Sequence, residues 1–474
     1  MAVTDKNVQA ALATNRFGLG ARPGELREAA DDPRGWLAAQ LGGGPPIALD
    51  GAGSLTSGSE ALAGFFKLRA LRQAMRQEEQ AGMGRAYAAP GDGKPKDDVV
   101  ASIAGYTRPI YLAEVAARTT TAVRSTAPLL ERLVWFWSNH FTVSAAKVAV
   151  APVAGAFERE AIRPHVLGRF GDMLQAVVHH PAMILYLDNA RSFGADSRRG
   201  RRAGGGLNEN LGRELLELHT VGVDAGYTQR DVTTFAQALT GWTINPGRRK
   251  PTGVGEFWYV GAVHEPGSKT VMGRTYPDTG EGQAEAILRD LAGHPATARH
   301  VAGKLARHFV ADDPPAGAVD RLARRFLDTG GDLREVTAEL VSLDAAWDPA
   351  LRKMKSPNEF VVSALRGLDA PQVEPRIVVA SLDSMGQRPF FAPSPAGWPD
   401  TVAAWAGPDG VYKRIEWSVA VGEKAGPKLH RADGLARSML GGLADDGLMT
   451  ALSRAESGAQ AVAMLLSSPQ FQRR

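Results

Sequence analysis

Residues 207–232 read LNENLGRELLELHTVGVDAGYTQRDV and carry the clearest helical signals in the chain. Apolar residues recur there every three or four positions, which predicts a helix over 208–222. Thr228 and Asp231 form a T-x-x-D capping signal, and this signal marks the start of a second helix over 229–240. Two adjacent helices in this stretch therefore indicate a helical fold class.

The same helical period recurs on both sides of this stretch. Residues 254–275 are the exception, because aromatic and β-branched runs flank a His-Glu-Pro-Gly turn and predict a β-hairpin insertion. We therefore expect a mainly α protein, a multi-helical single large domain over 5–470 with a small β-hairpin element and long Gly/Pro-rich loops. Further helices are predicted over 60–78, 101–144 with a break at Pro128, 157–188, 282–292, 296–310, 317–328, 332–343, 356–368, 430–443 and 458–467.

Glycine and proline are abundant, and cysteine is absent. The 474 residues include 53 Gly and 29 Pro, together about 17% of the chain against about 12% in average proteins. Much of this excess lies in 79–99, a predicted mobile loop, and in 194–206, a predicted basic flexible loop. The absence of cysteine excludes disulfides, thiolate metal sites and cysteine nucleophiles.

Charge and hydropathy limit the kinds of partner and the cell compartment that we expect for this protein. The formal net charge is +4, a small excess over 474 residues, so the charge gives no strong case for nucleic acid, whose binding usually needs basic residues clustered on one face. No run of 18 apolar residues occurs, so we expect no membrane span. The start of the chain lacks a basic and then apolar signal sequence, which favours the cytoplasm, with co-export to the periplasm as the alternative.

A polar face on the first helix is the strongest candidate site. At 100° per residue, Asn210, Glu214 and Glu217 fall within about 60° of one another, and Arg213 flanks them. Carboxylate and amide oxygens suit a divalent cation, and paired carboxylates suit proton transfer. The competing interpretation is a solvated surface on which Arg213 pairs with Glu209 and Glu217.

Asp188 and Asn208 flank the basic loop. Asp188 precedes this loop and is the fourth candidate metal ligand, after Asn210, Glu214 and Glu217. Asn208 is the point where the loop returns, and it is assigned to substrate binding. Asp188 also fits an ordinary helix-end or turn role.

The string WFWSNHF (135–141) supplies a candidate histidine. His140 is predicted on an apolar helix face, where a hydrogen-bonded core histidine is the ordinary case. The alternative is a pocket histidine with a tuned pKa, which would act as a base or a ligand in a site shared with Glu214, Glu217 and Arg213. Trp137 is either a pocket wall for substrate or part of the core.

Residues 384–400 form a Pro-rich aromatic loop. Trp398 in this loop could serve as a platform for a ring-shaped ligand such as a sugar, although packing is the ordinary role of Trp beside Pro. The sequence Gly-Ser-Lys-Thr at 267–270 lacks the spacing of a phosphate-binding loop. No G-x-S-x-G elbow occurs, so a serine hydrolase triad has no support.

Several strings together resemble one bacterial family, domain-of-unknown-function family 1800. The resemblance covers nearly the whole chain and implies one family unit. It carries no assigned catalytic residues. The strings are WFWSNHFTVS (135–144), YLDN (186–189), LNENLGRELLELHTVGVDAGYTQRDV (207–232), ALTGW (238–242), HEPGSKTVMG (264–273), HPATARHVAGKLARHFV (294–310), and MGQRPF with PSPAGWPD (within 385–400).

Two functions remain open at this point. The first is a hydrolase-like enzyme with a metal-assisted or acid–base polar site, acting on a carbohydrate or a phosphate or sulfate ester, with a divalent metal held by oxygen ligands. The second follows from the resemblance alone, because genes of this family often lie beside those of domain-of-unknown-function family 1501. Members of that family look like sulfatases, which implies a non-catalytic helical partner or an export or maturation factor for such a protein.

Overall fold

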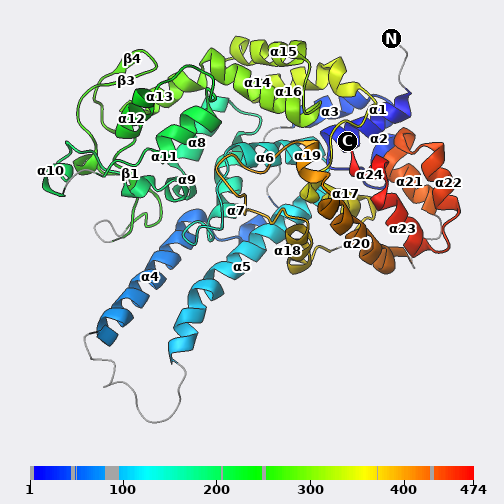
Figure 1. Ribbon diagram of the computed structural model, residues 1–474, viewed down its shortest axis with the longest axis horizontal. Coiled ribbons are helices and arrows are strands. Elements are labelled where there is room, and N and C mark those ends of the chain that lie inside the picture. The colour runs from blue at the N-terminus through cyan, green and yellow to red at the C-terminus, as the bar shows by residue number, and fades with distance from the viewer. Residues whose placement is uncertain are drawn as a thin grey trace.

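The computed structural model describes residues 5–43, 49, 51–80, 95–203, 206–247, 252–370, 372–426 and 432–474. It is mainly α, as the sequence predicts (Figure 1). No helix among these residues is both long and apolar enough to cross a bilayer. The chain begins with α1 (Lys6–Leu12), the π-helix η1 (Ala13–Phe17), α2 (Glu25–Ala30), α3 (Pro33–Gly42), η2 (Ala52–Ser54), α4 (Gly58–Gln80) and α5 (Pro95–Arg124).

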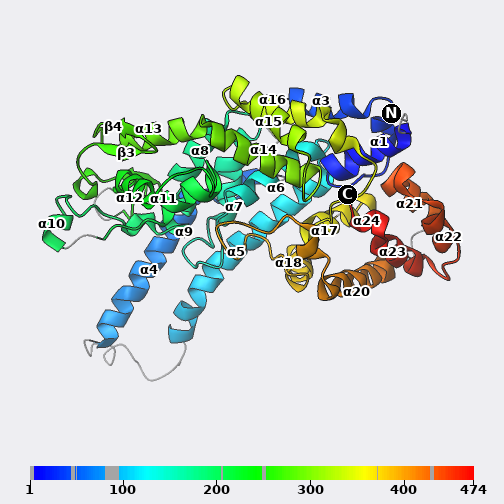
Figure 2. The same cartoon turned by 45° about the horizontal axis from the view of Figure 1, so that its top comes forward.

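The helices α4 and α5 extend away from the body in both views (Figure 1, Figure 2). Between them lies the predicted mobile loop 79–99. Its ends, 79–80 and 95–99, are helical, and residues 81–94 fall outside the described part of the chain. The predicted helix over 101–144 is divided at Pro128, as expected, because proline fits the first turn of the next helix.

The middle of the chain builds the body around that next helix. It contains α6 (Pro128–His140), α7 (Ala154–Phe157), the π-helix η4 (Glu158–Ile162), η5 (Arg163–His165), α8 (Phe170–His179), α9 (Pro181–Tyr186), η6 (Asn189–Arg191), α10 (Gly200–Ala203), α11 (Asn210–Glu214), the π-helix η7 (Leu215–His219) and α12 (Gln229–Ala238). The described part of the predicted basic loop 194–206 includes α10 and a β-bridge from Phe193 to Gly206.

The β structure differs from the predicted hairpin. β1 (Trp242–Ile244) pairs antiparallel with β2 (Phe257–Tyr259), and β3 (Lys269–Val271) pairs with β4 (Arg274–Tyr276). The runs on either side of His-Glu-Pro-Gly therefore belong to two different sheets rather than to one hairpin. Strand-forming composition identified β2 and β3, but it does not specify which partner each strand takes.

The remaining helices complete two contiguous cores. A large core extends from α1 to η9 and includes Val362 of α17, and a smaller one lies among α5, α17, α18 and α21–α24. Leu365, Phe390 and Phe391 pack against both cores. These helices are α13 (Glu281–Ala292), α14 (Pro295–Phe309), α15 (Ala316–Asp328), α16 (Leu333–Ser342), η8 (Gly261–Val263), η9 (Asp344–Trp347), α17 (Pro357–Gly367), α18 (Pro375–Ser384), α19 (Val402–Trp405), α20 (Pro408–Ala425), α21 (Ala432–Leu440), η11 (Gly441–Leu443), α22 (Asp446–Ser453), α23 (Gly458–Ser467) and α24 (Pro469–Gln472).

Side-chain caps fix several helix starts. The predicted T-x-x-D signal is a complete capping box, since Thr228 accepts from the backbone N–H of Asp231 and Asp231 accepts from that of Thr228. Ser356 and Glu359 form the same box at the start of α17. The second box places Glu359 at the edge of the pocket described next.

Candidate functional site

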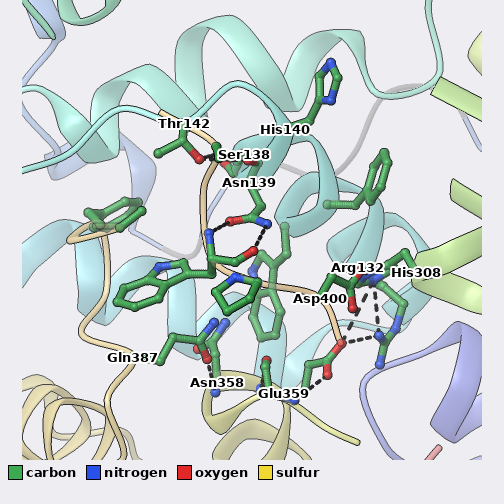
Figure 3. Close-up of a pocket in the computed structure, with 18 of the residues that line it drawn as sticks. Arg132, Ser138, Asn139, His140, Thr142, His308, Asn358, Glu359, Gln387 and Asp400 are labelled. Carbon is green, nitrogen blue, oxygen red and sulfur yellow. Dashed lines mark hydrogen bonds and ion pairs between the residues drawn. The ribbon is translucent and has the colours of Figure 1, made fainter. Parts of the chain in front are cut away.

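A pocket of about 320 Å³ lies between α6, α14, the start of α17 and residues 385–401, the last of which we call the 385–401 loop (Figure 3). Polar side chains and aromatic rings both line it. Trp135, Phe390, Trp398 and Trp405 are among its aromatic walls. The Pro-rich aromatic loop recognised in the sequence is therefore one side of a real cavity.

Asn139 holds the 385–401 loop against the end of α6. Its Oδ1 accepts from the backbone N–H of Trp398 at 2.7 Å, and its Nδ2 donates to the carbonyl of Trp398 at 2.9 Å. Gly397 has φ +83°, and a Cβ at this position would lie 2.4 Å from the Asn139 carbonyl oxygen. Only glycine fits both the backbone conformation and this close approach.

Glu158 lies on one wall of the pocket and is fully paired. Arg118 donates through Nε to both carboxylate oxygens at 2.9 Å, and Ser138 donates through Oγ at 2.7 Å. The Arg118 guanidinium lies 4.7 Å from the centre of the Trp135 ring, in cation–π range. This carboxylate is thus neutralised and oriented, which suits hydrogen bonding to a ligand better than acting as a free base.

A charge network formed by Arg132, His308, Glu359 and Asp400 makes up another part of the pocket wall (Figure 3). Glu359 pairs with Arg132 and, at 3.1 Å, with Arg474, while His308 Nδ1 lies 2.6 Å from Asp400 Oδ2. Burial alone would raise the pKa of Glu359, but Arg474 and Arg132 outweigh burial and hold that pKa well below its usual value. Burial also opposes the charged form of Asp400, yet His308 and Arg474 hold the Asp400 pKa far below the ordinary range.

His308 joins this network through both ring nitrogens. Burial lowers its pKa, and the pull of Asp400 toward the charged form does not compensate. Its Nε2 lies 3.4 Å from an Arg132 nitrogen, which can only donate. With Nδ1 facing Asp400 and Nε2 facing Arg132, both ring nitrogens are occupied, and His308 has no free lone pair for a ligand.

Lys304 differs from every other charged group of the pocket. It forms no hydrogen bond or ion pair with any residue that the structure describes. Burial lowers its pKa to about 8, with Asp400 acting in the opposite direction. An ammonium with this pKa can hold an anion and can also exchange a proton near neutral pH.

His140 reaches the pocket wall but belongs to the core. It is 2% exposed, its ring contacts Trp137 and Phe141, and its Nε2 lies 3.1 Å from the His219 carbonyl oxygen. Figure 3 shows its ring directed away from Asn139, His308 and Glu359. Burial, followed by the charge of Lys304, lowers its pKa well below the usual value. These contacts match the core histidine of the two alternatives, and the fully buried Trp137 packs beside it rather than lining the pocket.

The predicted acidic face does not join this pocket. Glu214, Glu217 and Arg213 are half-buried on the surface of α11 and η7, and none of them lines the pocket. Arg213 pairs with Glu209 at 3.0 Å and with Glu217 at 3.4 Å, the i,i+4 arrangement of the solvated-surface interpretation. Burial, followed by the charge of Glu217, raises the pKa of Glu214. The catalytic set that combined these carboxylates with His140 is therefore divided between two places.

The predicted oxygen-ligand metal site is likewise dispersed. Asp188 pairs with Lys147 at 2.7 Å, and Asn210 is exposed. Within the described chain, Asp188, Glu214 and Glu217 do not bring three carboxylate oxygens within 4.8 Å of one another. Asn208 accepts from the backbone N–H of Asn210 at 2.9 Å, a turn contact at the start of α11, and it does not line the pocket.

The assumed rotation of 100° per residue does not hold where the helix changes from α to π. After Glu214 the chain takes one π turn, Leu215–His219, whose hydrogen bonds span an extra residue. His219 is fully buried, whereas Leu218 is only half-buried, although a regular helix at 100° per residue would place it on the apolar side with Leu211 and Leu215. The carbonyl oxygens of Leu218 and His219 then lie 3.1 Å from the Nε2 atoms of His300 and His140.

Sequence reasoning missed the residues that define the pocket. Lys304 and His308 lie in the string HPATARHVAGKLARHFV, and Asn139 lies beside the singled-out His140. Each looks like an ordinary helical polar residue in the sequence. Only the packing of α6 against α14 shows that they share a cavity.

One family model, described as "Protein of unknown function (DUF1800)", matches residues 12–473. The chain belongs to the DUF1800 family. No curated protein and no solved structure matches it. Three of the strings that carry the DUF1800 resemblance, at 135–144, within 294–310 and within 385–400, meet at the pocket. The pocket is thus the site at which these separate parts of the DUF1800 chain come together.

Proposed function

We propose that this protein binds a phosphate or sulfate ester of a ring-shaped compound, such as a sugar, in the pocket between α6 and the 385–401 loop. The observation that carries the proposal is Lys304, an ammonium without an ion-pair partner among the described residues, in a cavity walled by tryptophans. An anionic group would supply the missing partner for Lys304. The tryptophan faces suit the ring.

The polar side chains support the same ligand. Asn358 and Gln387 line the cavity, and both amides can bond to hydroxyl groups. The carboxylates of Glu158, Glu359 and Asp400 are already paired with cations, so they repel an anion less than free carboxylates would. The pocket therefore tolerates a negative group at its Lys304 end.

The enzyme form of the proposal is hydrolysis of this ester. Water would attack phosphorus or sulfur, the ester bond would break, and Lys304 would give its proton to the leaving oxygen. The proton that the attacking water loses would then restore the ammonium of Lys304. A pKa of about 8 suits this step, because the amine is protonated at neutral pH and can still release the proton. The partner role beside a sulfatase-like protein of family 1501 stays a prediction.

Substitution of Lys304 tests binding and catalysis separately. Glucose 6-phosphate and 4-nitrophenyl sulfate serve as probes, with binding measured by calorimetry and hydrolysis by product release. K304M should weaken binding by roughly 10- to 100-fold, the usual value of a hydrogen bond to a charged group. K304R should keep binding but lose hydrolysis, because arginine stays protonated.

The exposed Lys424 supplies the control, since K424M removes the same charge outside the pocket. Equal affinity of K304M and K424M for the probes would refute the binding site. Tight binding without product release, in the wild type as in K304R, would leave the protein as a binding module and refute the hydrolase.

A further inference from the structure

His179, Glu281 and Glu285 form a cluster on the surface formed by α8 and α13, away from the pocket. His179 is the last residue of α8, and the two glutamates lie one turn apart at the start of α13. One ligand atom from each residue falls within 4.8 Å of the other two, and all three residues are half-buried. The closest measured pair is His179 Nε2 and Glu285 Oε1, at 3.6 Å.

The hydrogen bonding of His179 points its free nitrogen at the carboxylates. Nδ1 lies 2.8 Å from the carbonyl oxygen of Gln175, which can only accept, so Nδ1 carries a proton. Nε2 is then the atom with a lone pair in the neutral imidazole. Histidines that bind metals commonly have this arrangement, because the bond at Nδ1 fixes both the tautomer and the ring orientation.

The ring is also held in place by packing. Its centre lies 4.3 Å from that of Trp242 and 4.6 Å from that of Phe257, on the first small sheet. A ligand already fixed in orientation loses little conformational entropy when a metal binds. The hydrogen bond to Gln175 and the contacts with the two aromatic rings thus hold the imidazole with Nε2 toward the glutamates.

The carboxylates lack other cations. Among the described residues, neither Glu281 nor Glu285 forms an ion pair with a lysine or an arginine. A protonated His179 would account for Glu285 alone and leave Glu281 unpaired. A divalent cation would satisfy both carboxylates and the imidazole lone pair at once.

We propose that His179, Glu281 and Glu285 bind one Zn²⁺ or a similar first-row divalent ion, with water in the remaining position. An imidazole nitrogen with two carboxylates favours such an ion over Mg²⁺ or Ca²⁺, which prefer oxygen alone. Tetrahedral bonds of about 2.0–2.2 Å place ligand atoms a little over 3 Å apart, so small side-chain rotations close the site. The ion would join α8 to α13, and this site is independent of the Lys304 pocket.

The test measures metal content of the untagged full-length protein after dialysis against Zn²⁺ and then against buffer. The wild type should retain one Zn²⁺ per chain, and the double variant E281Q/E285Q should retain none. E423Q, which alters an exposed glutamate on α20, is the matched control and should retain one. Both substitutions in the double variant are at half-buried surface positions and keep side-chain size, which favours folding.

Two further readouts exclude a purely structural effect of the substitutions. Zn²⁺ should raise the Tm of the wild type and of E423Q but not that of E281Q/E285Q, and Co²⁺ should give a visible absorption band with the first two only. Equal Zn²⁺ retention by the wild type and E281Q/E285Q would overturn the proposal. Absence of retained Zn²⁺ in the wild type, or its displacement by an equal concentration of Mg²⁺, would overturn it as well.

Discussion

His219 is an imidazole without a hydrogen-bond partner on either nitrogen among the described residues, and it is fully buried. Burial, followed by the charges of Lys304 and His300, lowers its pKa to about 3. A neutral imidazole tolerates this environment, but an imidazolium does not. Protonation of His219 is therefore linked to unfolding.

The sign of that linkage gives a prediction for pH and stability. Below pH 6.5 the unfolded chain protonates His219 while the folded chain does not. The free energy of unfolding therefore decreases as the pH is lowered below 6.5. The loss reaches at most about 1.4 kcal/mol per pH unit per histidine. His219→Met should flatten this dependence between pH 6.5 and 5, measured by urea denaturation. His300→Gln, at a half-buried position whose pKa is also lowered by burial and then by Lys304, is the second variant. Slopes identical to that of the wild type in both variants would contradict the assignment.

At the scale of elements, the apolar periodicity of the sequence predicted regular helices correctly, but it did not predict where a helix departs from α geometry. The helices over 296–310 and 317–328 were predictable because an apolar stripe repeats along them, and α14 and α15 match these ranges closely. The π turn of η7 breaks the assumed 100° step, so the wheel placed Leu218 on the buried side. Residues 257–259 were identifiable as a strand, but their pairing with β1 depends on tertiary contacts.

The 385–401 loop depends on one amide for its position on α6. Asn139→Ala removes both hydrogen bonds to Trp398, which should lower the free energy of unfolding by roughly 1–3 kcal/mol, at 0.5–1.5 kcal/mol per bond. It should also weaken binding of the ester probes, because Trp398 is one wall of their pocket. Urea denaturation and acrylamide quenching of tryptophan fluorescence measure the two effects.

Asn139→Asp provides the comparison for that loop. An aspartate can still accept from the Trp398 N–H but cannot donate to its carbonyl, so an intermediate loss of stability is expected. Equal stability of Asn139→Ala and the wild type would show that the loop is held by its other contacts alone.

At the scale of the whole molecule, the charge network joins distant parts of the chain. Arg132 of α6, His308 of α14, Glu359 of α17 and Asp400 meet Arg474 within it. Their separations in sequence are the reason that the pocket was not predictable. A helical wheel shows which face of a helix is buried, but it does not show which other helix covers that face.

Glu359 is the centre of this network, because it pairs with both Arg132 and Arg474, and its substitution is the most direct test of the network. Glu359→Gln would leave Arg132 and Arg474 buried without their carboxylate, which should lower the free energy of unfolding by about 3–5 kcal/mol. Glu423→Gln, on an exposed surface, should change it by less than about 0.5 kcal/mol. Denaturant titration compares the two, and a similarly small effect of both would show that the network contributes little.

The π turn at Leu215–His219 has a further consequence, for chain length. A π turn accommodates one residue more than the α turn it replaces, so it acts as a single-residue insertion absorbed within a helix. Deleting one residue there would restore the α-helical ladder without opening a loop. The deletion would also rotate the carbonyl oxygens of Leu218 and His219, at the end of the helix, away from the imidazoles of His300 and His140. A one-residue deletion here would therefore keep the helix continuous, but it would disrupt the side-chain contacts that pack against it.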